Sequence, residues 1–501
     1  MSEATSITLR AATVGDLSAD LSAPNYDRSR ITSGIVHFGV GGFHRAHQAS
    51  YLDELLRRGG ARDWGICGVG VRQEDRRMRD VLAAQDGLYT LSVVAADGTR
   101  TTRVVGSIIE YLYAPDDPEA VIEKLAAPAT RIVSLTITEG GYNVAATTGE
   151  FIADNPEIRA DLTPNALPAT VFGLITEGLR RRRARGIAPF TVLSCDNIEG
   201  NGHVARRTFA AFARLRDPAL GDWVEHTVRF PNSMVDRITP VTPPGTSAEL
   251  ARRYGVTDRW PVVTEPFTQW VIEDSFSLGR PALDEVGVQL VSDVAPYELM
   301  KLRLLNASHQ ALAYLGYLSG YRLVHEAAQD PVFQQFLMRY MDHEATPTLY
   351  PVPGVDLDRY KRTLIERFAN PAIGDTIARL CAESSDRIPK WLLPVVRRQL
   401  ATGGEITCAA TVVASWARYA EGVDEDGAPI EVVDALRERL IPLARRQRDD
   451  PTAFLTDRSI FGDLIDEPRF VDAYTAVLNA LHTKGSRATL VELMRSDSQR
   501  G

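Results

Sequence analysis

The segment GIVHFGVGGFHR, residues 34–45, decides the fold of this chain. It begins with an apolar run that predicts a buried strand, and this run enters the three glycines Gly39, Gly41 and Gly42. Apolar side chains then recur at helical spacing until Gly59 ends the pattern. A strand, a glycine turn and a helix in this order form the context in which backbone amides approach a pyrophosphate. We therefore predict a dinucleotide-binding turn.

The residues of this turn have separate tasks. Gly39 allows the chain to reverse tightly, and Gly41 lets the backbone approach the phosphates. Gly42 and Phe43 complete the predicted cofactor site. A third glycine of the dinucleotide fingerprint would stand at position 44, where this chain has His44. The turn alone is therefore also compatible with a plain connection between a strand and a helix.

The next predicted strand, Trp64–Val71, gives a second sign of cofactor binding. Glu74 and Asp75 follow it, and a carboxylate at this place accepts hydrogen bonds from the ribose hydroxyls of adenosine. Their negative charge favours NAD over NADP, although Arg72, Arg76 and Arg77 lie close in sequence. A solvated turn that starts the next helix is the alternative explanation for the two carboxylates.

The rest of the pattern predicts two domains. Strands are expected at Arg131–Thr138 and at PFTVLS, which ends at Ser194, and Asp97-Gly98 predicts a hairpin that adds antiparallel strands to the sheet. Beyond about residue 290, helical patterns succeed one another. They cover Pro296–Tyr317, Pro331–Met341, Arg359–Phe368, Ile388–Leu400, Thr411–Glu421 and Val432–Leu440. We expect an α/β dinucleotide-binding domain over residues 1–285 and a mainly helical domain over residues 286–501.

Composition excludes several classes of protein. The 501 residues carry a net charge of -9, whereas a nucleic-acid surface needs a basic face. The four cysteines are scattered, so neither a disulfide framework nor a zinc cluster is encoded, and no metal site is expected. Residues 1–12 lack a basic stretch followed by an apolar one, and no apolar run has the length of a membrane span. We expect a cytoplasmic monomer or weak homo-oligomer without nucleic-acid or membrane partners.

The segment KLRLLNASHQAL, residues 301–312, places polar side chains in an otherwise apolar helical pattern. At about 100° per residue, Lys301, Asn306 and His309 fall within an arc of roughly 140°. Each residue alone fits a structural role: a lysine that reaches solvent, an amide cap, a histidine bonded in the core. A buried amine without a charge partner, however, has a lowered pKa and can act as a base. Together, and with a dinucleotide turn, the three predict a site where an alcohol loses a proton while hydride leaves for the cofactor.

Four motifs in this order resemble the polyol-specific long-chain dehydrogenases. They are GVGGFHRAH at 39–47, SCDNIEGNG at 194–202, VRFPNSMVDRITP at 228–240 and KLRLLNASHQAL at 301–312. The likeness covers nearly the whole chain. It implies an NAD(P)-dependent oxidoreductase that works without a metal, with an expanded Rossmann-type N-terminal domain and a mainly α-helical C-terminal domain.

The resemblance also implies roles for individual residues. Lys301 resembles the catalytic base and His309 the residue that orients the substrate. Asn197 and Asn306 resemble the pair that stabilises the oxyanion, and Glu139 is similar to the carboxylate that connects the proton of the lysine with solvent. The residues that the resemblance implies as substrate contacts are Asp236, Arg379 and Arg387, the last at a place where many relatives carry lysine.

Structural roles stay open for four of these residues. Glu139 follows a predicted strand and would also suit a cap on the next element. Asn197 would suit a turn, because Asn201-Gly202 predicts another turn in the same loop. Asp236 would suit an ion pair with the arginine that follows it, and Arg379 would suit an exposed helix position.

The expected reaction is the reversible oxidation of a polyol such as D-mannitol to the ketose D-fructose with NAD. A sugar-acid reductase acting on fructuronate or tagaturonate, which the same family contains, is the first alternative, with Arg379 or Arg387 facing the substrate carboxylate. A dinucleotide-binding sensor without catalytic activity is the second alternative. A sensor has no need of a buried amine, and this favours the enzyme.

Overall fold

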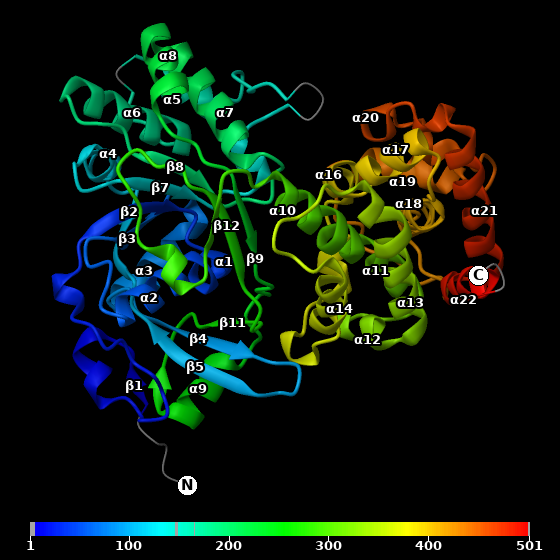
Figure 1. The fold of residues 1–501 in the computed structure, drawn as a ribbon, viewed down its shortest axis with the longest axis horizontal. Helices are drawn as coiled ribbons and strands as arrows, with labels where there is room; N and C mark the ends of the chain where they lie inside the picture. Colours follow the sequence, from blue (N-terminus) through cyan, green and yellow to red (C-terminus); the bar gives the residue numbers. More distant parts are fainter. Residues whose placement is uncertain (1–5, 146–148, 165, 499–501) are drawn as a thin grey trace. The chain divides into compact units, whose positions relative to one another are not determined.

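The computed structural model describes residues 6–145, 149–164 and 166–498, so the first five residues of the N-terminal segment considered above lie outside the described residues. Internal contacts divide the chain into two units, Met1–Ala295 and Pro296–Gly501 (Figure 1). The predicted boundary after residue 285 stays a prediction. Among the described residues, no helix combines the length and the apolar character needed to cross a bilayer.

A five-stranded parallel sheet, in the order β6-β3-β2-β7-β8, forms the centre of the first unit (Figure 1). The strands are β2 Ser33–Phe38, β3 Gly65–Gly70, β6 Ile108–Tyr113, β7 Ile132–Leu135 and β8 Thr191–Ser194. The chain starts at β2, runs outward through β3 to β6, and returns to the other side of β2 with β7 and β8. In such doubly wound sheets, ligands bind beyond the carboxyl ends of the strands where the order reverses. Here that place lies beyond β2 and β7.

Side chains alternate along each strand, so both faces of this sheet carry apolar residues, and helices cover both faces. Val36 and Phe38 of β2 belong to one buried cluster, and Ile35 belongs to the other. The first cluster includes α4 Pro118–Ala126, α5 Pro156–Leu162, α6 Val171–Ala184, α7 Asn201–Arg216 and α8 Pro218–Thr227. The second cluster includes α1 Gly42–Ala46, α2 Gln48–Arg57 and α3 Arg76–Ala84. The expected α/β domain is confirmed.

The predicted hairpin forms, but it does not extend the parallel sheet. Strands β4 Tyr89–Val94 and β5 Arg100–Val105 pair antiparallel, with Gly98 at φ +82° in the turn. Their other partner is β11 Val262–Thr264, which pairs with β4 in a separate three-stranded sheet. The expectation of antiparallel additions to the main sheet is wrong, because β6 itself occupies the edge beside β3.

Smaller elements complete the first unit. Strand β12 Gln269–Glu273 pairs with β9 Ser233–Asp236 and β13 Gln289–Val291, and β1 Ile7–Thr8 pairs with β10 Val256–Thr257. Helix α9 Thr246–Tyr254 precedes β10.

The second unit is helical, as predicted, and is organised around α11 Ala307–Leu318, which is buried on nearly every side. The other helices are α10 Ala295–Met300, α12 Val324–Gln329, α13 Pro331–Arg339, α14 Leu357–Phe368, α15 Ile377–Cys381, α16 Ser384–Trp391, α17 Leu393–Thr402, α18 Thr407–Tyr419, α19 Arg437–Arg446, α20 Arg458–Phe461, α21 Pro468–Lys484 and α22 Ser486–Ser498. All four cysteines of the chain are buried thiols, and none of them is part of a disulfide.

Several predicted helices have different limits, among them α18 Thr407–Tyr419, which was predicted over Thr411–Glu421. The pattern Ile388–Leu400 is split at Leu392, because Pro394 lacks an amide hydrogen and begins a new helix. The pattern Val432–Leu440 becomes helical only at Arg437. Here the Asp434 carboxylate accepts hydrogen bonds from the backbone N–H groups of Ser385, at 2.9 Å, and Leu436, at 2.8 Å. These bonds hold the preceding residues out of the helix.

Candidate active site

The glycine turn lies where the order of the main sheet reverses. Gly39 has φ +91°, and a Cβ atom there would stand 2.0 Å from the carbonyl oxygen of Thr136, at the end of β7. Only glycine fits this approach. A Cβ atom at Gly41 would meet nothing nearer than 3.9 Å, and one at Gly42 nothing nearer than 3.7 Å. The backbone of the turn is therefore open to a ligand on this side, which fits a dinucleotide phosphate.

His44, which replaces the third glycine of the fingerprint, packs on His37. Their rings stack at 3.4 Å between centroids, with an angle of 13° between planes, and both side chains are buried. Burial lowers the pKa of His37 to about 3, so this ring is neutral. The Thr136 hydroxyl donates to the Gly39 carbonyl oxygen at 2.7 Å, so it must accept from Nε2–H of His37 at 3.0 Å. The neutral imidazole thus helps to hold the glycine turn against β7.

The helix after the turn is interrupted. Helix α1 ends at Ala46, and His47 has φ -112° and ψ -93° before α2 begins. The predicted continuous helix is therefore two helices. Phe43, a predicted cofactor residue, lies in α1, and its ring stacks on that of His47 at 4.9 Å.

The two predicted ribose ligands differ in their surroundings. Oδ2 of Asp75 accepts the backbone N–H groups of Val71 and Arg72, each at 2.9 Å, so this carboxylate closes the turn after β3. Glu74 is exposed beside it. Asp75 therefore has the structural role named as the alternative, and the contact of either residue with ribose stays a prediction.

A buried aspartate that the sequence did not single out, Asp196, organises the loop after β7. Its carboxylate accepts the N–H groups of Ile137 at 3.1 Å and Thr138 at 2.9 Å, and the hydroxyl of Tyr142 at 2.8 Å. Burial raises the pKa of Asp196 to about 6 against the effect of these bonds, and the charge of Glu139 adds to the rise. Thr138 has φ +65°, a strained conformation for a residue with a side chain. Strain just before Glu139, which is half-buried, is typical of a functional loop.

Asn201 connects the loop after β8 with the strand that carries Asp236. Its amide donates to the carbonyl oxygens of Asp196 at 3.0 Å and Ser233 at 2.7 Å and accepts from N–H of Ser233 at 3.0 Å. Asn201 begins α7, so the predicted Asn201-Gly202 turn is wrong. A Cβ atom at Gly202 would stand 2.5 Å from the Phe230 carbonyl oxygen, which explains this glycine as a packing contact.

The predicted site residues of this loop and strand differ in exposure. Asn197 is exposed in the loop after β8. Asp236 ends β9 and is buried, with 4% of its surface exposed.

In the second unit, Lys301 and Asn306 lie at the two ends of a π-turn, Lys301–Asn306, between α10 and α11. The N–H group of Ala307 donates to the carbonyl oxygen of Leu302, five residues earlier. The projection at 100° per residue is therefore wrong for this segment. Because residues five apart lie one above the other in such a turn, Lys301 and Asn306 still share a face. Both side chains are buried, at 6% and 5% exposure, and π-turns are frequent at functional sites.

The π-turn is stabilised by contacts from elsewhere in the same unit. The Tyr340 hydroxyl donates to the carbonyl oxygen of Arg303 at 3.1 Å, and Nη1 of Arg303 donates to the carbonyl oxygen of Thr348 at 2.6 Å. Tyr340 begins a second π-turn, Tyr340–Ala345, at the end of α13. Tertiary contacts therefore satisfy the irregular backbone.

Positive charges surround His309. Burial lowers its pKa well below the ordinary value, and the charges of four cations lower it further, so the ring is neutral. These cations, in order of effect, are Arg379, Arg367, Lys301 and Arg387. The ring of Phe368 packs on the imidazole at 4.3 Å. The second unit thus brings four of its predicted site residues together and adds Arg367, a buried arginine that the sequence analysis did not single out.

Fixed neighbours orient the two predicted substrate arginines. Arg379 forms a two-pronged ion pair with the buried Asp375, with Nε 2.7 Å from Oδ1. Nη1 of Arg387 donates to the carbonyl oxygens of Arg379, at 3.1 Å, and Leu380, at 3.3 Å. Arg379 is exposed in α15, as the structural alternative predicted, and the ion pair holds its guanidinium in place.

Among the described residues, no group of three or more His, Cys, Asp or Glu side chains is placed to hold a metal ion.

Two family models match the chain: the mannitol dehydrogenase Rossmann domain over residues 33–285 and the mannitol dehydrogenase C-terminal domain over residues 293–482. The chain belongs to the mannitol dehydrogenase family. The resemblance predicted from four motifs is confirmed, and so is the order of a Rossmann-type domain followed by a helical one.

Named members of the mannitol dehydrogenase family are similar over almost their full length. The mannitol 2-dehydrogenase of Aspergillus fumigatus is 48% identical over 474 residues, which cover 93% of this chain and 94% of that protein. The mannitol 2-dehydrogenase of Phaeosphaeria nodorum is 45% identical over 477 residues, which cover 94% of this chain and 83% of that protein.

Two solved structures of similar proteins also match. The Pseudomonas fluorescens mannitol 2-dehydrogenase, in a ternary complex with NAD and D-mannitol, matches with a TM-score of 0.91 and 47% identity, over 98% of this chain and all of that one. A D-sorbitol dehydrogenase in substrate-free form matches with a TM-score of 0.87 and 39% identity, over 97% of this chain and all of that one.

Proposed function

We propose that this chain is an NAD-dependent polyol dehydrogenase that interconverts D-mannitol and D-fructose. The observation that carries this proposal is the similarity of the whole chain to an enzyme solved with NAD and D-mannitol. Relatives named mannitol 2-dehydrogenase, which match both domains, support it.

The glycine turn fits the cofactor. The backbone at Gly39, Gly41 and Gly42 would hold the pyrophosphate, with Phe43 beside it, because a Cβ atom is excluded at Gly39 and space is open at the other two. Exposed Glu74 and half-buried Asp75 would accept the adenosine ribose hydroxyls. NAD, when bound, accepts hydride from the substrate carbon or returns it.

Lys301 is the proposed base for oxidation and the acid for reduction. Its side chain is buried, and in its deprotonated form the amine can remove the proton of a substrate hydroxyl. Asn306, on the same face of the π-turn, and Asn197 donate hydrogen bonds to the oxygen as it becomes negative. Neutral His309 orients the hydroxyl, and Glu139 passes the proton of the lysine to solvent.

Asp236, Arg379 and Arg387 are the proposed contacts with the remaining substrate hydroxyls. The pairing of Arg379 with Asp375 favours a neutral polyol over a sugar acid, because the charge of this guanidinium is already met.

A substrate panel tests the proposal. NADH formation and consumption should be followed with D-mannitol, D-sorbitol, D-fructose and fructuronate, each with NAD and NADP cofactors. We expect the highest kcat/KM for D-mannitol and D-fructose with the NAD couple. Faster reduction of fructuronate than of fructose would instead establish the sugar-acid reductase. NADH binding without turnover of any compound would establish the sensor.

We also propose that the protein works in the cytoplasm, as a monomer or weak homo-oligomer without macromolecular partners. Light scattering across a range of protein concentrations measures the mass, and a concentration-independent oligomer would contradict this proposal.

A further inference from the structure

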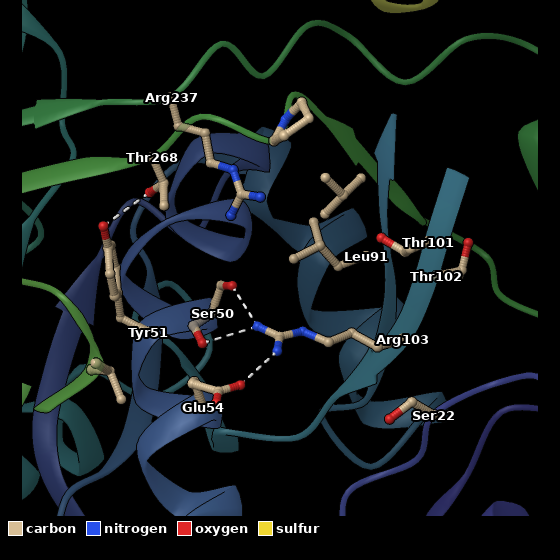
Figure 2. Close-up of a pocket in the computed structure, with 13 residues that line it drawn as sticks. Ser22, Ser50, Tyr51, Glu54, Leu91, Thr101, Thr102, Arg103, Arg237 and Thr268 are labelled. Carbon is tan, nitrogen blue, oxygen red and sulfur yellow. Dashed lines mark hydrogen bonds and ion pairs between the residues drawn. The ribbon is translucent and has the colours of Figure 1, made fainter. Parts of the chain in front are cut away.

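The first unit contains a cavity of about 470 Å³ that the proposed reaction does not use (Figure 2). Its walls come from α2, the β4/β5 hairpin and the segment between residues 237 and 286, all within Met1–Ala295. The residues that line it do not include the glycine turn. The volume lies in the range of roughly 300–1,000 Å³ that is typical of small-molecule sites.

Two guanidinium groups, those of Arg103 and Arg237, point into this cavity (Figure 2). Nη1 of Arg103 lies 3.1 Å from Oε2 of Glu54, and its Nη2 donates to the Ser50 hydroxyl at 2.8 Å. Glu54 also pairs with Arg58, at 3.1 Å. One carboxylate is therefore shared between two arginines, and the cavity keeps an excess of positive charge.

Arg237 adds to this excess of positive charge, because its hydrogen bonds go to carbonyl oxygens, which carry no formal charge that would neutralise it. It donates to Ala46 at 2.5 Å and to Glu265 at 3.1 and 3.2 Å. Burial lowers the pKa of Arg237 to about 10, and the charge of Arg103 lowers it further, with an effect larger than the opposing one of Glu265. The Glu265 carboxylate accepts the backbone N–H of Ile238 at 2.6 Å. The two cations that face the cavity thus repel each other, and an anion between them would relieve this repulsion.

Hydroxyl groups line the wall beside the arginines. The Tyr51 hydroxyl oxygen accepts from Thr268 at 3.1 Å, and the Ser50 oxygen accepts from Arg103. Since each hydroxyl has one proton and these bonds use oxygen lone pairs, both groups can still donate to a ligand. Leu91 forms part of an apolar wall. Such a lining suits a ligand with several hydroxyl groups as well as a charge.

We propose that this cavity binds a small polyhydroxy anion, a sugar carboxylate or a sugar phosphate, with its oxyanion between Arg103 and Arg237. The planar fork of a guanidinium matches both oxyanions. The ligand hydroxyls face Ser50 and Tyr51. The site lies outside the proposed reaction, and its test does not depend on that reaction.

The test uses gluconate, glucose 6-phosphate and uncharged glucose with the full chain at constant ionic strength. Calorimetry measures binding, and hydrogen exchange locates it. We expect at least one anion to bind and to protect the hairpin Tyr89–Val105 from exchange, while glucose does not. Gluconate alone would identify a carboxylate site, and glucose 6-phosphate alone a phosphate site. Failure of both anions to bind, or protection that spares the hairpin, would overturn the proposal.

Matched arginine variants test the assignment of the cation. Arg103→Gln should weaken anion binding by at least about 10-fold, because a hydrogen bond to a charged group is lost. Tyr51→Phe should weaken anion binding by a smaller factor. It tests the site independently if Arg103→Gln does not fold. Arg100→Gln is the control, since Arg100 lies on the same strand, pairs with Glu249 at 2.7 Å and does not line the cavity. Equal losses in Arg100→Gln and Arg103→Gln would contradict a specific site.

Discussion

The loops at the carboxyl ends of β7 and β8 and the π-turn of the second unit arrange polar groups in opposite ways. In the loops, the side chains of Asp196 and Asn201 form hydrogen bonds with backbone groups, and Asp196 also bonds Tyr142. These bonds fix the shape of the chain. In the second unit, cations gather around His309, and burial together with their charges keeps it neutral. The first arrangement suits a surface that must hold a ligand in place. The second arrangement suits a site where a proton is transferred.

The largest expected effect is that of Lys301→Ala. If the π-turn region carries the chemistry, kcat with D-mannitol falls by about 10²–10⁴-fold, the usual contribution of a general base. NADH binding, followed by fluorescence, stays unchanged because the glycine turn is intact. Lys361→Ala is the control, since Lys361 is also buried but pairs with Asp342 and Asp358. It should lower stability and leave the kcat of the folded enzyme unchanged. Near-normal turnover of Lys301→Ala would remove the lysine from the mechanism.

Gly39→Ala tests the rigidity of the first region. We expect the free energy of unfolding to fall by about 3 kcal/mol or more, because positive φ and a clash with the Thr136 carbonyl act together. Gly98→Ala, at φ +82° with open space around it, should cost only about 1 kcal/mol. Urea denaturation measures both. Similar losses would mean that the close approach at Gly39 is relaxed in solution.

Each unit also contains a buried carboxyl group with a raised pKa, that of Asp196 at about 6 and that of Glu344 at about 7. Glu344 accepts the N–H groups of Cys408 at 2.5 Å and Ala409 at 2.8 Å, at the start of α18. Since burial makes the folded state bind these protons more tightly than the unfolded state, the contribution of each group to stability is greatest below pH 4. It falls as the pH rises from about 4 to 6 for Asp196, and from about 4.5 to 7 for Glu344, by about 3 kcal/mol each.

Unfolding measured between pH 4 and 8 tests this pH dependence. Asp196→Asn should flatten the slope in the lower window, and Glu344→Gln should flatten it in the upper window. A variant that keeps the slope of the wild type would show that its carboxyl group is not the one that titrates.

The smallest expected effect is that of Arg387→Lys. The change keeps the charge near His309 and removes a guanidinium that bonds the carbonyl oxygens of Arg379 and Leu380. Loss of about 1 kcal/mol in positioning should raise KM for D-mannitol by up to about 5-fold and leave kcat close to the wild-type value. An unchanged KM in steady-state kinetics would contradict a contact between Arg387 and the substrate.

The elements that depend on one or two neighbouring residues could be predicted from the sequence. Gly39, at φ +91°, allows a backbone that few other residues adopt, and Gly98, at φ +82°, does the same for the hairpin. The π-turn at Lys301 was not predictable. Whether a backbone N–H group bonds to the carbonyl oxygen four or five residues earlier depends here on distant groups such as the Tyr340 hydroxyl. Asp196 resembles many loop aspartates until folding buries it. One signal was available, since it stands next to Asn197 in a motif already quoted.

The π-turn means that the helix from Ala295 to Leu318 carries one residue more than a regular helix of the same span would need. Such an insertion is absorbed within one turn and leaves both flanking helices intact. Deleting one residue between Leu302 and Leu305 would restore bonding four residues apart, and Lys301 and Asn306 would still lie one above the other. The extra residue therefore widens the helix locally between the amine and the amide and leaves the face that they share unchanged.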